Sequence, residues 1–253
     1  ILLRQIRDPE LSPDGTRLVF SALDRLYLLQ LPNGKPRRLT SDTILEQQPR
    51  WSPDGKQIAY VTWGIGGGAI LAVSADGRGK PSRLTPGPAF YQYPAWSPDG
   101  SRIVALRGPR EARISESFGP GYELVWLPAK GGTVQRVAPV NPGGRPHFSR
   151  SPDRIYLYDP GEGLLSMRFD GTDRRAHLKV TGFTVNAPAA EPNAADEILI
   201  APDSTRALAL VNNYIYLVNL PLTGQQPLVL NVADPAAAVF PAKRLTRTGG
   251  DFI

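Results

Sequence analysis

A five-residue turn motif recurs along this chain at a nearly constant interval, and it limits the folds open to the sequence. The five copies read LSPDG, WSPDG, WSPDG, RSPDR and IAPDS, and their prolines stand at positions 13, 53, 98, 152 and 202. Successive prolines are therefore 40, 45, 54 and 50 residues apart. This is the period of the four-stranded blade of a β-propeller. The repeat predicts an all-β propeller in which five blade units are visible.

The residues around each turn repeat as well. After the turn comes a short alternating apolar run such as TRLVFSA or KQIAYVT, and a second run such as RLYLLQL or AILAVSA follows it. These runs alternate as half-buried strands do. A turn with Gly or Pro and a closing segment such as RRLT or SRLT complete the unit. Each unit thus predicts four strands, which we call a, b, c and d.

The Pro, Asp and Gly of the turn motif each have a structural explanation. Proline sets φ near −65°, Asp caps the turn through backbone N–H groups, and Gly takes the left-handed conformation. We therefore predict that Asp14, Asp54 and Asp99 are turn residues rather than catalytic ones. The Trp before the motif is expected on strand a, in the space between neighbouring blades.

We predict a single propeller domain over residues 1–253. Its blade units are expected at about 6–41, 46–86, 91–139, 145–181 and 196–248, and residues 249–253 look like the start of a further strand. Two alternatives stay open for the ring. Either five blades close it, or the sequence is a fragment of a longer chain with a six-bladed ring, which is the alternative that we favour.

Composition excludes several classes of protein. The chain has no Cys, so disulfides, thiolate metal sites and a Cys nucleophile are ruled out. No apolar run reaches the roughly 20 residues of a membrane span, so membrane insertion is not expected. The net charge is +6, but the basic residues are scattered, and no block of five like charges occurs. We therefore expect no nucleic-acid partner.

No catalytic, metal or cofactor motif is found. The two histidines, His147 and His177, lack the paired ligands of a zinc site, and we expect them to be surface or cap residues. There is no G-x-S-x-G nucleophile elbow. The stretch GIGGGAI (residues 64–70) lacks the Gly-Lys-Ser/Thr ending of a phosphate loop, so we predict an ordinary loop between strands. Catalytic residues, metal ligands and cofactors are all predicted to be absent.

Binding residues are expected in the loops instead, because loops on a rigid scaffold often carry function. In a propeller, the d-to-a and b-to-c connections gather at one mouth of the central channel. Tyr and Arg are typical anchors of binding surfaces. The b-to-c loop GPREARISESFGPGY (residues 108–122) is the longest and most charged of its kind. The predicted binding residues are Gln48, Tyr91, Tyr93, Arg110, Arg113, Arg145 and His147.

The pattern P-x-W-S-P-D-G-x-x-I-A, followed by L-T some 30 residues later, resembles the blades of the TolB propeller family. The first three units match closely, whereas the fourth and fifth lose the Trp and the Gly. A narrower resemblance rests on EGLLSMRFDGTDRRAHLKVTG (162–182), RALALVNNYIYLVNLP (206–221) and KRLTRTGGDFI (243–253). These stretches are similar to the propeller that precedes the metal-dependent barrel in some large bacterial amidohydrolase-family proteins. In that family the propeller is an accessory domain, and its metal ligands lie in the barrel.

Two functions follow from these observations. The first is a non-catalytic module that binds a protein or peptide partner, or packs on another domain. The second is the accessory propeller of a metal-dependent amidohydrolase whose hydrolase domain lies elsewhere in a longer chain. A weaker third hypothesis is a TolB-like component of an envelope complex, although the small α/β domain that precedes the TolB propeller has no counterpart here. The resemblance implies a periplasmic or secreted bacterial protein.

Overall fold

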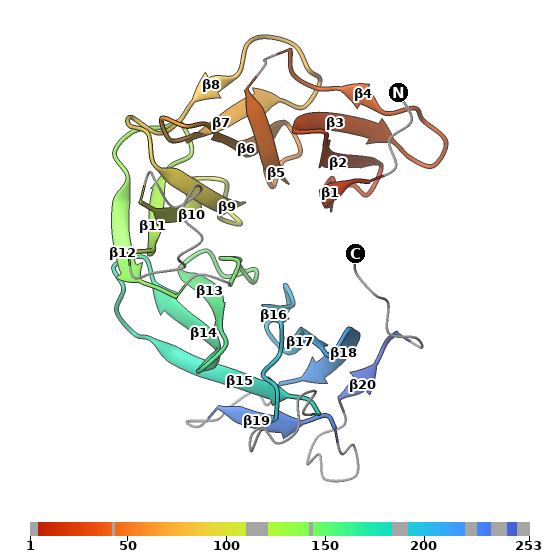
Figure 1. Cartoon of the computed structure of the whole chain (residues 1–253), viewed down its shortest axis with the longest axis vertical. Coiled ribbons are helices and arrows are strands. Elements are labelled where there is room, and N and C mark those ends of the chain that lie inside the picture. Colours follow the sequence, from red (N-terminus) through yellow and green to blue (C-terminus); the bar gives the residue numbers. More distant parts are fainter. Residues whose placement is uncertain are drawn as a thin grey trace. The chain divides into compact units, whose positions relative to one another are not determined.

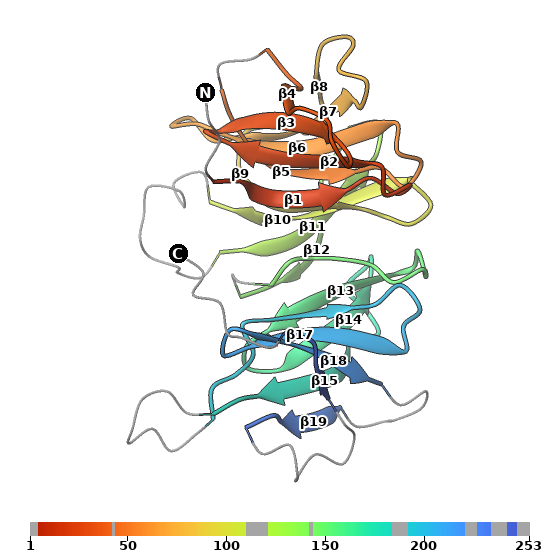
Figure 2. The same cartoon turned by 90° about the vertical axis from the view of Figure 1, so that its right-hand side faces the viewer.

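The chain folds into β-sheet throughout the residues that the structure describes. The computed structural model describes residues 5–41, 44–109, 121–141, 144–183, 192–220, 227–233 and 242–246. Its strands form five four-stranded sheets, which are the blades of a β-propeller (Figures 1 and 2). The predicted fold class is confirmed. Among these described ranges no helix has the length and apolar character needed to cross a membrane.

The blades belong to two compact units, residues 1–142 and residues 143–253. The first unit holds blades one to three, and each blade follows the predicted order of four antiparallel strands. Blade one consists of β1 (Arg7–Leu11), β2 (Arg17–Ala22), β3 (Arg25–Gln30) and β4 (Arg37–Arg38). Blade two consists of β5 (Leu45–Trp51), β6 (Gln57–Trp63), β7 (Ala69–Ser74) and β8 (Ser82–Arg83). Blade three consists of β9 (Phe90–Trp96), β10 (Arg102–Gly108), β11 (Glu123–Pro128) and β12 (Gln135–Pro139).

The repeated motif forms the same turn in all three blades. In blade one the Ser12 hydroxyl donates to Asp14 Oδ1 at 2.5 Å and accepts the Arg17 N–H at 2.9 Å. The Thr16 N–H donates to the same carboxylate at 3.0 Å, and Gly15 has φ +70°. The Ser12 hydrogen bond is the main reason why the pKa of Asp14 falls to about 2. The predicted turn-capping role of this Asp is confirmed.

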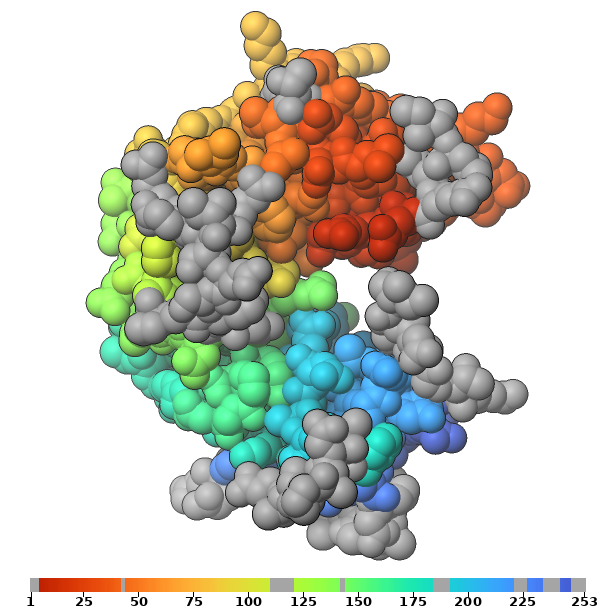
Figure 3. All heavy atoms as spheres, in the orientation of Figure 1, coloured from red at the N-terminus to blue at the C-terminus, as the bar shows by residue number. Residues whose placement is uncertain are grey.

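The apolar core of the first unit lies between its blades. Blades one and two share a cluster that includes Val19, Leu26 and Tyr60, and blades two and three share one that includes Ile70 and Ile103. In the space-filling view the atoms of blades one and two form one continuous surface, coloured red to orange (Figure 3). A single blade cannot bury both faces of its sheet, so each core is completed by the next repeat.

The motif tryptophans connect these blades by a repeated hydrogen bond. The indole N–H of Trp51 donates to the carbonyl of Glu10 in blade one at 3.1 Å. The indole N–H of Trp96 donates to the carbonyl of Arg50 in blade two at 3.2 Å. The predicted position of the Trp between neighbouring blades is confirmed, and the bond explains why Trp rather than another large apolar residue stands here.

The second unit departs from the four-strand pattern. Blade four consists of β13 (Arg154–Asp159), β14 (Gly163–Arg168), β15 (Arg175–Thr181) and β19 (Leu228–Asn231), and β19 pairs in parallel with β15. Blade five consists of β16 (Glu197–Ile200), β17 (Arg206–Val211), β18 (Tyr214–Asn219) and β20 (Lys243–Arg244). Strand β19 comes from the connection between β18 and β20 of blade five.

The expectation of a full strand a in the fourth unit is therefore wrong. Its place is taken by one bridge, in which His147 and Tyr156 exchange backbone hydrogen bonds of 2.9 and 2.8 Å. Pro146 precedes this bridge and has no N–H to donate, which limits the ladder here. The core of the second unit nevertheless lies between its two blades and includes Tyr158, Leu178 and Ile198.

Candidate functional site

The first strand of each blade in the first unit carries a β-bulge at the same place in the repeat. The bulged residues are Asp8, Gln48 and Tyr93, each five positions before the motif proline. Their φ angles are 48°, 53° and 51°, in the left-handed region that residues other than Gly seldom adopt. A bulge re-aims side chains and is often found beside a functional site. This position is where two of the predicted binding residues lie.

The structure brings Gln48 and Tyr93 into direct contact. The side-chain oxygen of Gln48 accepts the backbone N–H of Tyr93 at 2.7 Å, and Gln48 is only 5% exposed. This bond links the bulge of blade two with the bulge of blade three. Gln48 thus positions the backbone of Tyr93, whose side chain is half-buried. A contact of either residue with a partner stays a prediction.

Tyr91 is buried in the packing between blades two and three. Its backbone carbonyl accepts the indole N–H of Trp63 at 2.9 Å, and only 3% of the residue is exposed. Burial raises the pKa of its phenol, an effect that the nearby Arg107 opposes. Tyr91 therefore supports the site from within, and its role as a binding residue also stays a prediction.

The second unit holds Arg145 and His147, which also take part in internal interactions. Arg145 Nε lies 3.0 Å from Glu197 Oε1, although 42% of the Arg side chain remains exposed. His147 Nδ1 lies 2.8 Å from the Arg145 carbonyl, and Nε2 accepts the Ile200 N–H at 2.9 Å. Burial lowers the pKa of His147 to about 4, so the imidazole is neutral at pH 7. Arg110 and Arg113 lie outside the described residues.

Blade four contains a polar cluster that sequence reasoning missed. The Ser166 hydroxyl lies 2.6 Å from His177 Nε2, as in a nucleophile–base pair. Arg154 Nη2 donates to the same hydroxyl at 2.9 Å, and Arg154 Nη1 donates to Asp173 at 2.5 Å. Ser166 is 0% exposed, however, so no substrate reaches its oxygen. The cluster joins β13, β14 and β15, and its members meet through cross-strand register that residue spacing does not reveal.

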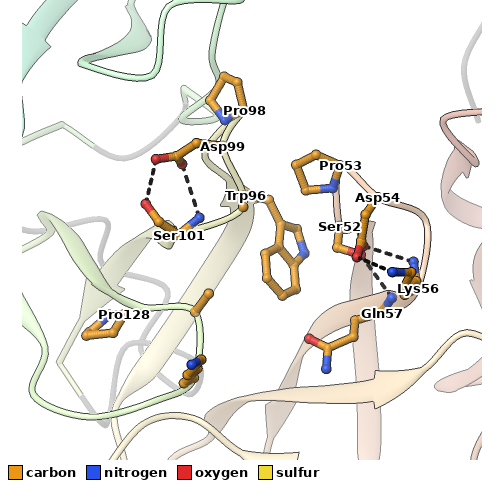
Figure 4. Close-up of a pocket in the computed structure, with 13 residues that line it drawn as sticks. Ser52, Pro53, Asp54, Lys56, Gln57, Trp96, Pro98, Asp99, Ser101 and Pro128 are labelled. Carbon is orange, nitrogen blue, oxygen red and sulfur yellow. Dashed lines mark hydrogen bonds and ion pairs between the residues drawn. The ribbon is translucent and has the colours of Figure 1, made fainter.

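The described residues offer no metal centre, since no group of three or more His, Asp or Glu side chains in them is arranged to hold an ion. The first unit has an open groove of about 820 Å³ between the motif turns of blades two and three. Figure 4 shows the Trp96 ring between the turn that carries Pro53 and the turn that carries Pro98, and all three residues line the groove. We call this feature the turn groove. The full lining is Ser52, Pro53, Asp54, Lys56, Gln57, Trp96, Pro98, Asp99, Gly100, Ser101, Pro128, Ala129 and Lys130.

The carboxylates beside the turn groove are engaged in their own turns. Asp54 accepts hydrogen bonds from Ser52 at 2.7 Å and from the Lys56 N–H at 3.1 Å. Asp99 accepts from Ser97 at 2.5 Å and from the Ser101 N–H at 3.1 Å. These hydrogen bonds lower the pKa of both carboxyls. Both groups are therefore fixed anions at neutral pH, and the arrangement suits binding rather than proton transfer.

The five four-stranded blades define the fold of the chain as a β-propeller. Comparison with known proteins finds a family model that matches part of the first unit. Residues 5–118 match the model of the TolB beta propeller domain. The resemblance of these blades to TolB, inferred from the motif, is confirmed.

Three relatives illustrate the match. A solved structure of TolB from Acinetobacter baumannii has a TM-score of 0.55 and 26% identity, and the alignment covers 68% of this chain and 42% of that one. A protein named as a tricorn protease homolog from Streptomyces coelicolor is 46% identical over 59 residues, which are 23% of this chain and 5% of the relative. A protein named as a tricorn-like protease N-terminal subunit, from Sulfurisphaera tokodaii, is 42% identical over 67 residues. That alignment covers 24% of this chain and 34% of the relative, so the chain spans about a third or less of the length of these curated relatives.

Proposed function

We propose that this chain is a non-catalytic propeller module that binds a protein or peptide, and that the turn groove is its contact surface. The observation that carries the proposal is the open groove lined by Trp96. Tryptophan is among the residues that contribute most to binding energy at interfaces. The walls are motif turns held by short hydrogen bonds, so little conformational entropy is lost when a partner binds.

The predicted residues at the other end of the first strands belong to the same proposal as further partner contacts. Tyr93 is half-buried, and the bulge fixes its backbone. In the second unit, the exposed part of Arg145 is available beside its ion pair with Glu197. Gln48, Tyr91 and His147 are proposed to act by supporting these side chains from within.

A library of random peptides displayed on phage, selected on the intact chain, tests the binding function. Gln57 is exposed and lines the turn groove, so Gln57→Trp fills the groove without disturbing the core. Gln135 is equally exposed but lies on β12 outside the groove, so Gln135→Trp is the matched control. We expect selected peptides to bind the wild type and Gln135→Trp alike, and to lose at least tenfold in affinity with Gln57→Trp. No enriched peptide, or equal binding to both variants, would overturn the proposal.

A second candidate function is the accessory propeller of a larger hydrolase. Two relatives are named as a protease homolog and as a protease subunit, and the alignments cover 5% and 34% of their lengths. The resemblance of residues 162–182, 206–221 and 243–253 to an amidohydrolase-associated propeller supports the same idea, with a metal-dependent barrel as the neighbour. The intact mass of the native gene product separates the candidates. A mass near 27.5 kDa contradicts this second one, and a mass several times larger supports it.

We also propose that the protein works in the periplasm or outside the cell. The match of residues 5–118 to the TolB propeller domain supports this location. Fractionation of source cells with an antibody against the chain provides the test. Recovery of the native product with the cytoplasmic fraction alone would contradict the proposal.

A further inference from the structure

Two equivalent junctions between blades occur in the first unit, and the first of them is filled by an arginine. The guanidinium carbon of Arg17 lies 4.6 Å from the centre of the Trp51 ring. Arg17 Nη2 also donates to the carbonyl of Gly55 in the next motif turn at 3.1 Å. Trp51 stands two residues before Pro53, and Gly55 stands two residues after it. The junction therefore holds a guanidinium between an aromatic face and a turn carbonyl.

The second junction has the same parts but lacks the arginine. Trp96 and Gly100 stand two residues before and after Pro98, as Trp51 and Gly55 do around Pro53. Arg17 is the fourth residue after its own motif proline, and the fourth residue after Pro53 is Gln57. The shorter, uncharged Gln side chain does not repeat the contact, and this junction is the turn groove.

The surroundings of the two glycines show the same difference. A Cβ built on Gly55 would lie 3.6 Å from Arg17 Nη2 and 3.6 Å from Pro13 Cδ. A Cβ built on Gly100 would lie 3.9 Å from Pro53 Cδ, and nothing else is within 4 Å. Both junctions thus have a proline beside the glycine, whereas at the second junction the place of the guanidinium is open. The first junction acts as an internal example of what the second can hold.

We propose that the turn groove binds the guanidinium group of an arginine in a partner peptide. The guanidinium lies over the Trp96 ring and donates to the Gly100 carbonyl, as Arg17 does at Trp51 and Gly55. The inference rests on the proposed binding function and names the side chain that the groove selects. Arginine is favoured over lysine because its planar group stacks on an aromatic face and donates hydrogen bonds at the same time.

The charges around the groove fit this ligand. The Asp54 and Asp99 carboxylates line the groove and are held ionised by their turns. Lys56 Nζ lies 3.7 Å from Asp54 Oδ2 and offsets part of the negative charge of Asp54. Lys130 is exposed on the same lining and opposes a cationic ligand. We therefore expect Lys130→Ala to strengthen binding of an arginine peptide.

The test uses the intact chain and a blocked peptide, acetyl-Ala-Ala-Arg-Ala-Ala-amide, followed by NMR. The chain has four Trp residues, so each indole N–H can be assigned and the site of binding read directly. The matched probe replaces Arg with citrulline, which has nearly the same shape and no charge. We expect the arginine peptide to shift the Trp96 indole signal saturably, with at least tenfold weaker binding of the citrulline peptide.

Two variants complete the test by exchanging the two junctions. Gln57→Arg supplies the guanidinium from the chain itself and should abolish binding at Trp96. Arg17→Gln empties the first junction and should create a second site that shifts the Trp51 indole signal. An unchanged Trp96 signal, or equal binding of the citrulline peptide, would overturn the inference. If library peptides without arginine occupy the groove, the binding function stands and the arginine assignment alone fails.

Discussion

The neutral, half-buried imidazole of His147 makes the stability of the second unit sensitive to mild acid. Its Nδ1 donates to the Arg145 carbonyl, and its Nε2 accepts the Ile200 N–H. Protonation would place a hydrogen on Nε2, where it would oppose the Ile200 N–H donor. The ring of Tyr156 packs against the imidazole at 6.0 Å between centroids.

The magnitude follows from the difference between the two pKa values. The pKa of His147 is about 4 in the folded chain, against 6.5 as its ordinary value. The unfolded chain therefore takes up a proton first, and folding stability falls as pH decreases from 6.5 to 4. A difference of about 2.5 pKa units corresponds to about 3 kcal/mol in total, of which about 2 kcal/mol is lost by pH 5. Above pH 6.5 the loss vanishes.

Urea unfolding of the wild type and of His147→Gln, measured at intervals from pH 7 to pH 4, provides the assay. Glutamine does not titrate, so the variant should lose most of the pH dependence in this window. His177 also has a lowered pKa, because of its burial and the nearby Arg154 and Arg175, and it leaves a smaller slope of the same sign. His177→Gln is the control that should retain the larger slope. Parallel curves for the wild type and His147→Gln would refute the reasoning.

Three further predictions concern the scaffold. Trp51→Phe removes the indole hydrogen bond to blade one and weakens the contact with Arg17. We expect the free energy of unfolding, measured with denaturant, to fall by about 2 kcal/mol. A loss below half of this would count against the bond. Gln48→Ala leaves the Tyr93 N–H without its acceptor and should lower the free energy of unfolding by about 1–3 kcal/mol. Gln48→Gly should recover up to about 1 kcal/mol of this loss, because Gly adopts φ 53° without strain. Thermal melting should therefore rank the wild type above Gln48→Gly, and Gln48→Gly above Gln48→Ala. Gly131→Ala places a Cβ 3.1 Å from backbone atoms of blade two at φ +88° and should lower the melting temperature, while Gly87→Ala, with nothing within 4 Å, should leave it nearly unchanged.

The roles of Asp and Gly in the motif turn could be predicted because the turn is local, whereas the hydrogen bonds of the Ser12 hydroxyl were not foreseen. The parallel strand of blade four could not be predicted. Strand β19 pairs with β15 from about 50 residues further along the chain, and nothing in the letters LVLN indicates which sheet they join. Strand pairing of this kind depends on tertiary packing rather than on propensity.

The candidate site was harder to predict because the bulges break the alternation of each first strand. Simple alternation exposes one of Gln47 and Gln48, yet both are 5% exposed, since the extra residue at the bulge turns both inward. The turn groove was missed for another reason. The groove exists because Gln57 has no guanidinium group, whereas Arg17 fills the equivalent junction with one. This difference becomes visible only when the two repeats are superposed in space.

The repeated indole bond has a consequence for how such a chain can lengthen. The Arg50 carbonyl in blade two accepts the indole N–H of Trp96. The Glu10 carbonyl, at the equivalent position in blade one, accepts the indole N–H of Trp51. A tandem duplication of residues 46–90 would thus produce a blade that finds a matching donor on one side and a matching acceptor on the other. Such growth needs no new interface to evolve. The fourth repeat lacks this bond, because Arg150 holds the position of the tryptophan.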